Sequence, residues 1–403
     1  MVKIKLEIEH DVNSYVSKND DFLIHSSKHG ELYENDNLDW LINNQSKYAG
    51  KIKCIYIDPP YNTGRDFCYN DKRKNNDINH SQAKDSEWLT FMYSRLSLTK
   101  NLLTDDGGIF ISIDENEIHN LKILMNHIYG KENFVGTLTW KKRTIKNDAK
   151  FGLSTDNEYI LVFCKNPKIF KLSRKFTRQY YKTDDLQEEW RYNSLQCPKT
   201  KEQSPKAFFD IIDPKTGIIY KCNPNRVWIT SKEIAEESIK NNKIIFPNTY
   251  TFLKNKQPLF RIFKSEDIKK KGEDVLTRGT ISNILPQEEV GLNAEATKEN
   301  IKLFGSNVFT HPKPVRLIKK LIDIIGLKPN DIILDFFAGS GTTAQAVIEL
   351  NKQENKNIKF ILVQNDEPIN PKTTGYQFFL DNNLKTTISS LTLQKIRRVE
   401  NGK

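Results

Sequence analysis

The sequence has no cysteine arrangement typical of a disulfide framework or a zinc site. Its five cysteines among 403 residues are odd in number and widely spaced, and no two form a Cys-x-x-Cys pair. No histidine lies at zinc-ligand spacing from them. We therefore expect reduced, partly buried thiols, no bound metal and a cytoplasmic location.

Long apolar runs are also missing. The chain has no run of about 18 apolar residues, so it predicts no membrane-spanning helix and no membrane partner. Residues 1–7 alternate charged and apolar side chains and lack the apolar core of a secretory signal. We expect a soluble protein that is not exported.

Negative charge is in deficit: 62 Lys and Arg stand against 51 Asp and Glu, a formal net charge of +11. A basic surplus favours a polyanionic partner, and nucleic acid is the first candidate. The alternative is a compositional bias of the source, in which lysines merely solvate the surface. The length of 403 residues favours a core with one or two appended modules over one compact domain.

Apolar periodicity predicts alternating strands and helices in two parts of the chain. After a polar, helical lead-in over residues 1–50, we expect strands at 54–57, 109–113 and 159–163, helices at 86–103 and 117–129, and a turn at 105–108. The rhythm returns with helices at 314–325, 343–350 and 386–398 and strands at 331–335 and 359–364. This alternation is typical of an α/β fold with a parallel sheet.

Residues 165–290 interrupt the series. They are rich in lysine, carry scattered aromatic residues and contain turn signals such as Asp213-Pro214 and Asn223-Pro224. We expect an inserted module of mainly β or mixed structure. Its basic and aromatic side chains are suited to phosphate contacts and base stacking, although most of the aromatics are expected to form its core.

One stretch, residues 55–64, ends an apolar strand abruptly at Asp58-Pro59-Pro60-Tyr61. Two prolines fix their own φ angles, so the strand end presents a carboxylate, fixed carbonyl oxygens and a phenol side by side. Such a site suits a flat molecule with an amine; the alternative is an ordinary strand-to-turn transition. The polar residues 68–85 that follow are expected to be a loop, either closing over a substrate or tolerated as an insertion.

A second stretch follows the predicted strand 331–335. It reads Asp335-Phe-Phe337-Ala-Gly339-Ser-Gly341-Thr342, and the next helix begins there. The glycines let the backbone approach a ligand closely, but the Gly-Lys-Ser/Thr of a phosphate loop is absent. In a parallel sheet both stretches lie at the carboxyl edge, where ligands bind. If their strands are neighbours, one loop holds a cofactor and the other a flat aromatic substrate.

Together the two motifs resemble the S-adenosylmethionine-dependent amino-group DNA methyltransferases. The order, with Asp-Pro-Pro-Tyr first, is that of the β class, and Asp-Pro-Pro-Tyr-Asn-Thr-Gly is similar to the modification subunits of type III restriction–modification systems. The pattern also resembles theirs at residues 108–114, 158–162 and 311–314. The resemblance implies a Rossmann-like methyltransferase fold with a mostly parallel sheet. Residues 1–164 and 291–403 would form the catalytic domain in circularly permuted order, and 165–290 a target-recognition domain.

The resemblance also implies roles for individual residues. The catalytic group is Asp58, Pro59, Pro60 and Tyr61, in which the Asp58 carboxylate and Pro59 carbonyl accept the hydrogens of an adenine amine and Tyr61 stacks on the flipped base. The residues expected to bind S-adenosylmethionine are Asp335, Phe337, Gly339, Gly341, Thr342, His311, Lys313, Gln364 and Asp366. Among these, Asp335 would take the ammonium of the cofactor and Thr342 or Lys313 its carboxylate, with Gln364 or Asp366 at the ribose.

The implied activity is sequence-specific methylation of adenine N6, since Asp rather than Ser precedes Pro59. The implied partners are double-stranded DNA, a restriction subunit and a second copy of the chain in a homodimer. Cytosine-N4 methylation is the alternative with the same chemistry. A non-catalytic DNA-binding specificity subunit and a nicotinamide-dependent oxidoreductase are alternatives of other classes, disfavoured by the intact Asp58–Tyr61 string and by the positive charge.

Overall fold

The computed structural model describes residues 17, 19–63, 80–145 and 152–402. The chain divides into two compact units, one formed by residues 1–174 and 280–403 and the other by residues 175–279. The second unit is shorter at both ends than the predicted insertion 165–290. Its assignment to target recognition stays a prediction.

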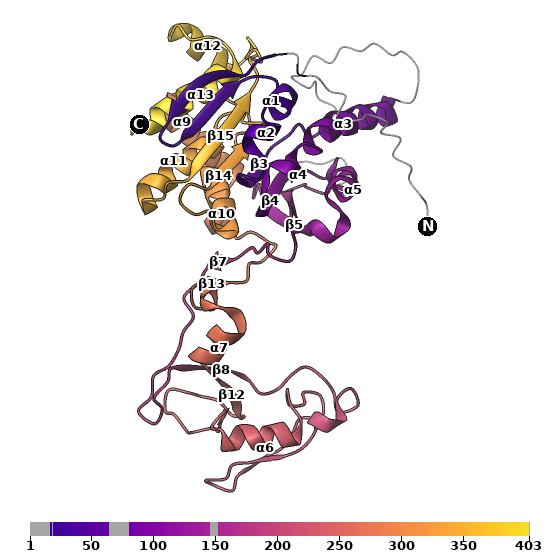
Figure 1. Ribbon diagram of the computed structural model, residues 1–403, viewed down its shortest axis with the longest axis vertical. Helices are drawn as coiled ribbons and strands as arrows, with labels where there is room; N and C mark the ends of the chain where they lie inside the picture. The colour runs from indigo at the N-terminus through magenta and orange to yellow at the C-terminus, as the bar shows by residue number, and fades with distance from the viewer. Residues whose placement is uncertain (1–16, 18, 64–79, 146–151, 403) are drawn as a thin grey trace. The chain divides into compact units, whose positions relative to one another are not determined.

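An eight-stranded sheet is the centre of the first unit (Figure 1). Its strands in spatial order are β1 (Phe22–Ser27), β2 (Gly30–Glu34), β15 (Lys359–Gln364), β14 (Ile332–Asp335), β3 (Ile52–Ile57), β4 (Leu103–Ile113), β6 (Asn157–Cys164) and β5 (Phe134–Lys141). The five strands from β2 to β4 are mutually parallel, and β1, β6 and β5 are antiparallel to their neighbours. The predicted α/β class with a mostly parallel sheet is confirmed, although β6 is antiparallel to β4.

Strands β3 and β14 are neighbours, with Cys54 opposite Ile333 and Ile55 opposite Leu334. The chain leaves β3 towards β4 on one side and leaves β14 towards β15 on the other. The order of strands therefore reverses between β3 and β14, which is the position where open α/β sheets bind ligands. Asp58 follows β3 directly and Asp335 ends β14, so the two predicted motifs lie side by side at this point.

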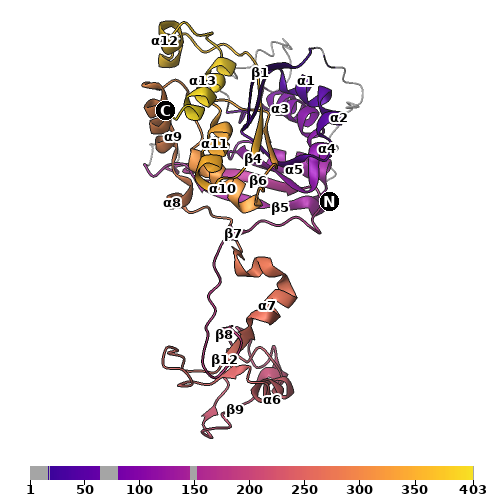
Figure 2. The ribbon, with the colours of Figure 1, turned by 60° about the vertical axis from the view of Figure 1, so that its left-hand side comes forward.

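Helices cover both faces of the sheet (Figure 2). One face packs on α10 (Val315–Ile325), α11 (Thr342–Glu354) and α13 (Ile388–Glu400), through strand residues such as Cys54, Phe110 and Ile333. The other face packs on α1 (Asn37–Asn43), α2 (Gln45–Tyr48), α3 (His80–Leu96), α4 (Thr99–Leu102) and α5 (Ile118–Tyr129), through the alternate strand residues Ile55, Ile109 and Leu334. Because side chains alternate along a strand, each apolar strand serves both cores.

The predicted helix 314–325 shows why the local signals were sufficient here. Helix α10 begins after Pro314, whose fixed φ suits a helix start, and ends at Gly326, which has a left-handed φ of 71°. Seven of its eleven residues are buried. The predicted strands 331–335 and 359–364 and helices 117–129, 343–350 and 386–398 are likewise confirmed within a few residues at their ends.

Four local predictions are wrong in whole or in part. Residues 22–34 form the hairpin β1–β2 instead of a helical lead-in, because β2 pairs in parallel with β15 far along the chain. Residues 105–108 belong to β4, where the register against β3 shifts: Leu103 pairs with Ile52 and Gly108 with Cys54, so the residues between them form a bulge within the strand instead of a turn that ends a helix. The predicted helix 86–103 is divided into α3 and α4, and residues 80–85 of the predicted loop belong to α3, whereas residues 68–79 lie outside the described part.

The remaining helices of the first unit complete its α10 side. They are α8 (Gln287–Val290), α9 (Asn293–Phe304) and α12 (Thr374–Asp381), and the last two pack in a small apolar cluster around Phe304 and Phe379. A 3-10 turn, η2 (Lys131–Asn133), precedes β5. Strand β5, like α9 and α12, was not predicted.

The second unit is a small mixed module. Its elements are β8 (Trp190–Ser194), β12 (Leu259–Phe263), β11 (Ile244–Ile245), β9 (Ile211–Ile212), β10 (Ile219–Tyr220), α6 (Lys232–Lys240), α7 (Lys264–Lys271), η3 (Pro205–Ala207) and η4 (Glu273–Leu276), while β7 (Arg174–Lys175) and β13 (Arg278–Gly279) lie where the chain passes between units. Trp190 and Trp228 are buried in its core, whereas Phe252 and Tyr192 are 48% and 38% exposed. The expectation was that most of its aromatics form the core, and in the structure some do while others lie at the surface.

Two expectations from composition concern the whole chain. Cys54, Cys164, Cys197 and Cys222 are free thiols, and three of these four are buried. Among the described residues, no helix has the length and apolar character needed to cross a bilayer.

Candidate active site

The Asp58–Tyr61 segment is held rigidly at the end of β3. The Pro60 carbonyl accepts a hydrogen bond of 2.7 Å from the indole N–H of Trp88, a buried residue of α3. Asn62 has a left-handed φ of 53°, and its amide donates to the buried Glu117 carboxylate at 2.6 Å. These contacts fix the direction of the chain on either side of Tyr61. Gly64, the last residue of the motif, lies outside the described residues.

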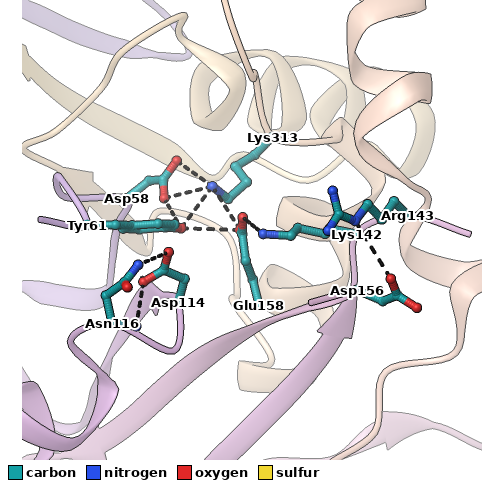
Figure 3. A network of polar contacts seen from close by, with 9 residues as sticks. All are labelled: Asp58, Tyr61, Asp114, Asn116, Lys142, Arg143, Asp156, Glu158 and Lys313. Atoms are coloured by element: carbon teal, nitrogen blue, oxygen red, sulfur yellow. Dashed lines mark hydrogen bonds and ion pairs between the residues drawn. The ribbon is translucent and has the colours of Figure 1, made fainter. Parts of the chain in front are cut away.

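Lys313 reaches this segment from the loop before α10 (Figure 3). Its ammonium donates to both carboxylate oxygens of Asp58, at 2.8 and 2.7 Å, and to the Tyr61 hydroxyl at 3.0 Å. The Tyr61 hydroxyl in turn donates to Asp58 Oδ1 at 2.6 Å. The predicted catalytic acid and phenol are therefore brought together, with a lysine between them.

A second carboxylate, Glu158 on β6, completes the network. Its Oε2 lies 3.3 Å from the Tyr61 hydroxyl and 3.3 Å from Lys313 Nζ, and its Oε1 accepts a hydrogen bond of 3.2 Å from Lys142. Burial alone would raise the pKa of Glu158, but the Lys313 and Lys142 ammonium groups outweigh it and lower that pKa. Glu158 is therefore an ionised, buried acid beside the predicted catalytic one.

The same charges act on Lys313 and Tyr61. Burial alone would lower the pKa of Lys313, but the Asp58 and Glu158 carboxylates outweigh it and raise that pKa. Burial, and then the negative charge of Asp58, raises the pKa of the Tyr61 phenol well above its ordinary value. The network thus holds a neutral phenol between an ammonium and two carboxylates.

The glycine loop after β14 is held by hydrogen bonds to a buried acid. The two oxygens of Asp335 accept hydrogen bonds from the Phe337 N–H at 3.1 Å and the Thr343 hydroxyl at 2.6 Å. Burial raises the pKa of Asp335 to about 7. Gly339 and Gly341 have left-handed φ values of 51° and 80°. The loop thus has the backbone conformation that its glycines were expected to allow.

Two side chains fix the position of Gly339. Its N–H donates to the Gln364 side-chain oxygen at 2.8 Å, and its carbonyl accepts a hydrogen bond of 2.6 Å from Thr392 on α13. A Cβ atom at Gly341 would lie 3.1 Å from Cγ2 of the same Thr392. The loop is therefore clamped between the end of β15 and helix α13.

A small polar recess lies beside this loop. It is lined by Asp36, Asn37, Phe336, Val363, Gln364 and Asn365, at the carboxyl ends of β2, β14 and β15. Asn37 donates to the Phe336 carbonyl at 2.9 Å, and Asp36 caps helix α1. Carboxylate and amide oxygens beside a glycine loop suit the hydroxyl and amine groups of a nucleoside, so the residues present fit an adenosine-bearing cofactor.

The predicted cofactor ligands are distributed unevenly around the loop. Asp335, Phe337, Gly339, Gly341 and Gln364 lie in it or against it. Thr342 is buried, with its hydroxyl 3.1 Å from Ser340 Oγ and 3.5 Å from Lys395 Nζ.

Three predicted ligands are placed differently. Asp366 has a side chain that is 68% exposed and pairs with Lys385 at 3.6 Å, outside the recess lining, and His311 is exposed with a φ of 56°. Lys313 contacts Asp58 and not the glycine loop in this structure. The roles of all these residues as cofactor ligands stay predictions.

Sequence reasoning missed Asp36, Asn37, Lys142 and Glu158 as parts of the site. The signal for the first two was the Asn-Asp-Asn string at residues 35–37, which the helical interpretation of residues 1–50 obscured. Glu158 was noticed only as part of a matching stretch. No local pattern shows that it faces Asp58.

Comparison with known proteins gives the family. Residues 52–370 match the N6/N4 methyltransferase family, described as DNA methylase. The chain belongs to this DNA methylase family. It is 32% identical over 402 residues to the Mod subunit of the type III restriction-modification enzyme StyLTI of Salmonella typhimurium, covering 93% of this chain and 57% of that one. It is 30% identical over 397 residues to the type II methyltransferase M.KpnI of Klebsiella pneumoniae, covering 93% and 89%.

The chain spans between 57% and 61% of the length of three Mod subunits that it matches, and 47% of the length of a fourth. Among solved structures, it resembles a putative DNA modification methylase from Thermus thermophilus complexed with S-adenosyl-L-methionine, at 14% identity and a TM-score of 0.39, covering 92% of this chain and 96% of that one. It also resembles the cytosine-N4-specific PvuII DNA methyltransferase, at 15% identity and a TM-score of 0.44, covering 93% and 94%.

Proposed function

We propose that this DNA methylase transfers a methyl group from S-adenosylmethionine to the exocyclic N6 amine of adenine at a specific sequence in double-stranded DNA, within a restriction–modification system. The observation that carries the proposal is the adjacency of β3 and β14, which places Asp58-Pro-Pro-Tyr61 beside the Asp335–Gly341 loop at the carboxyl edge of the sheet. The similarity to the Mod subunits supports adenine as the base and a restriction subunit as a partner. A homodimer is part of the same proposal.

Methylation of an adenine amine requires hydrogen-bond acceptors for that amine, and the end of β3 provides them. The lone pair of an adenine amine is delocalised into the ring, so the amine is a poor nucleophile. Hydrogen bonds from both amine hydrogens, to the Asp58 carboxylate and the Pro59 carbonyl, favour a pyramidal nitrogen with a localised lone pair. These bonds strengthen as positive charge develops on the nitrogen, so they stabilise the transition state more than the ground state.

The base must leave the duplex to reach this site. Extruding it costs on the order of a few kcal/mol. Stacking on an aromatic ring returns about 1–3 kcal/mol per base, and Tyr61, fixed by its hydrogen bond to Asp58, offers such a ring. The basic surplus of the chain, a formal net charge of +11, favours the phosphate contacts that any DNA complex needs.

The cofactor site is the loop and recess beside β14 and β15. Gly339 and Gly341 let the backbone approach the methionine part, and Asp36, Asn37 and Gln364 line the recess suited to the nucleoside. Asp335 is the acid nearest the loop for the ammonium group. S-adenosylmethionine supplies an already activated methyl group, so the residues of this chain mainly position the two reactants.

Single-molecule sequencing of DNA from a methylation-free host that expresses the protein tests the proposal. We expect N6-methyladenine at one sequence motif, and none when the host expresses the Asp58→Ala variant. N4-methylcytosine at a motif would overturn the base assignment and keep the reaction class. Unmodified DNA, together with purified protein that binds S-adenosylmethionine but transfers no methyl group, would support a non-catalytic specificity subunit instead.

A further inference from the structure

We propose that Lys313 is a positioning residue for the Asp58 carboxylate: its ammonium occupies the place of the target amine before the base arrives, and transfers to Glu158 when the base enters. The inference rests on the proposed function in that it needs an exocyclic amine as the acceptor of the methyl group. It concerns a residue that the motifs alone had suggested as a cofactor ligand.

The first step is the overlap between Lys313 and the expected amine. Lys313 donates to both oxygens of Asp58, at 2.8 and 2.7 Å. Its nitrogen also lies 5.1 Å from the centre of the Tyr61 ring. A base that gives its amine hydrogen to Asp58 and stacks on Tyr61 needs the same acceptors and the same ring. Lys313 and Tyr61 together make three hydrogen bonds to the Asp58 carboxylate, which has about four acceptor sites in all. Because the ammonium also lies over the ring on which the base would stack, it must move before the amine can bind Asp58.

The second step is the destination of the ammonium. The Lys313 side chain is only 10% exposed, and a buried charge without a counter-ion is costly. Glu158 is already 3.3 Å from Lys313 Nζ, and its own side chain is 9% exposed. A small rotation of the flexible lysine chain would bring it to Glu158 without exposing either group to water. The centre of the Trp140 ring lies 5.9 Å from the ammonium, so this ring offers the lysine a cation–π contact.

The third step is the charge balance of the cluster. Two carboxylates, Asp58 and Glu158, face two ammonium groups, Lys313 and Lys142. A neutral amine leaves this balance unchanged when it enters. Once Lys313 has moved to Glu158, Asp58 is free of its cation at the moment when positive charge develops on the methylated nitrogen. The Asp58 carboxylate then stabilises the transition state more than the ground state.

The surroundings also explain why the ammonium is needed before the base arrives. The titratable and charged groups that face Lys313 or its partners come from five strands or their ends: Tyr56, Asp58 and Tyr61 from β3, Asp114 after β4, Lys142 after β5, Glu158 on β6 and Asp335 on β14. Four of these groups are carboxylic acids, of which Glu158 and Asp335 are buried and Asp58 and Asp114 are partly exposed. Without Lys313, their mutual repulsion would favour a proton on one of them, which would spoil the acceptor that the amine requires.

The test combines cofactor binding with the pH dependence of the rate. The binding of S-adenosylmethionine is measured by calorimetry without DNA. Initial rates of labelled methyl incorporation are measured into genomic DNA from a methylation-free host, between about pH 6 and about pH 9, the range over which an essential acid group is read from the rate. The variants are Lys313→Met, Lys313→Arg and Glu158→Gln. Lys320→Met is the matched control, since Lys320 on α10 pairs with Glu289.

We expect Lys313→Met to lower kcat about 100-fold, as for a misplaced reacting group, without raising the KM for DNA. The acidic limb of its rate profile should shift to higher pH, and Lys313→Arg should restore that limb because it keeps the charge. Glu158→Gln should have a different effect and raise the KM for DNA, because Lys313 then keeps competing with the target amine for Asp58. Lys320→Met should behave as wild type.

The affinity for S-adenosylmethionine distinguishes this proposal from the alternative in which Lys313 binds the cofactor carboxylate. We expect Lys313→Met to change the Kd for S-adenosylmethionine by less than about threefold. A loss of about tenfold or more would place Lys313 on the cofactor carboxylate and overturn the proposal. An unshifted rate profile in Lys313→Met would also overturn it, because a purely structural lysine predicts no shift. If wild-type protein methylates cytosine, the base assignment fails but the inference is still decided by these variants, since cytosine N4 is also an exocyclic amine.

Discussion

The side-chain oxygen of Gln364 accepts a hydrogen bond of 2.8 Å from the backbone N–H of Gly339. This contact joins the end of β15 to the turn of the glycine loop, and Gln364 is itself only 6% exposed. The residue predicted from its position as a ribose ligand therefore also holds the glycine loop in the shape seen in this structure. The predicted recognition of the nucleoside and the observed shape of the loop would then depend on the same amide.

Gln364→Leu should weaken cofactor binding by about tenfold, because it leaves the partly buried Gly339 N–H without its acceptor, at a cost of about 1–3 kcal/mol. Calorimetry with S-adenosylmethionine measures the change. Gln364→Glu is the matched control, since it keeps an oxygen at the same position and should retain most of the affinity. Equal losses in the two variants would show that the amide nitrogen, not the contact with Gly339, determines binding.

Gly341→Ala should lower the free energy of unfolding by more than backbone strain alone accounts for. Gly341 has a φ of 80°, which costs a residue with a Cβ atom about 1–2 kcal/mol, and that Cβ would also lie 3.1 Å from Thr392 Cγ2. Gly305 provides the control, because it has a φ of 81° with no atom within 4 Å of the added Cβ. In denaturant unfolding, Gly341→Ala should cost more than Gly305→Ala. The double change Gly341→Ala with Thr392→Ser should recover the difference, and failure to do so would exclude the Thr392 contact as its cause.

The elements that could be predicted from the sequence are those determined by their own residues and immediate neighbours in the chain. Strands β3, β14 and β15 are short buried apolar runs with polar or proline-containing ends, and α10 has a clear start and stop. The hairpin β1–β2 has no such local cause. Gly30 fits there because any Cβ would lie 2.1 Å from the Phe360 carbonyl, a neighbour brought in by the sheet.

The candidate site divides in the same way. Asp58 and Gly339 belong to recognisable sequence motifs. Their proximity could therefore be predicted once β3 and β14 were taken as adjacent strands. Lys313 and Asp58 are 255 residues apart, and only the fold determines that the lysine reaches the acid. Asp366 was suggested by its position after β15, but its carboxylate turns to Lys385. Side-chain direction at a strand end depends on alternation and packing, which counting residues does not give.

Asp335→Asn should remove a pH dependence of stability. Burial raises the pKa of Asp335 to about 7, above its unfolded value of about 4. Between these two values the folded state binds more protons than the unfolded state, so stability falls as pH rises from about 4 to about 7 and then stays lower. In Asp335→Asn this decline should be absent. The stability of the variant minus that of wild type should therefore be greater at pH 8 than at pH 5. Thermal unfolding at both pH values measures it, with Asp105→Asn as the control because the Asp105 side chain is 76% exposed. Parallel curves for wild type and Asp335→Asn would contradict the prediction.

Asp58→Ala should abolish methyl transfer while leaving the fold and cofactor binding intact. Removing a pre-organised acceptor of the reacting amine costs at least about 10²–10³ in kcat. The glycine loop, which follows β14 and is held by Gln364 and Thr392, loses no contact. Lys313 keeps Glu158 as its counter-ion, so the buried ammonium is not left alone.

Labelled methyl incorporation into unmethylated genomic DNA measures the activity of Asp58→Ala, and calorimetry measures its affinity for S-adenosylmethionine. Asp105→Ala is the control, since the exposed Asp105 pairs with Lys165 at the opposite end of β4 from Asp114. It should methylate DNA as wild type does. Incorporation at the wild-type rate by Asp58→Ala would refute the catalytic role of Asp58, and with it the assignment of the β3 end as the place where the target amine binds.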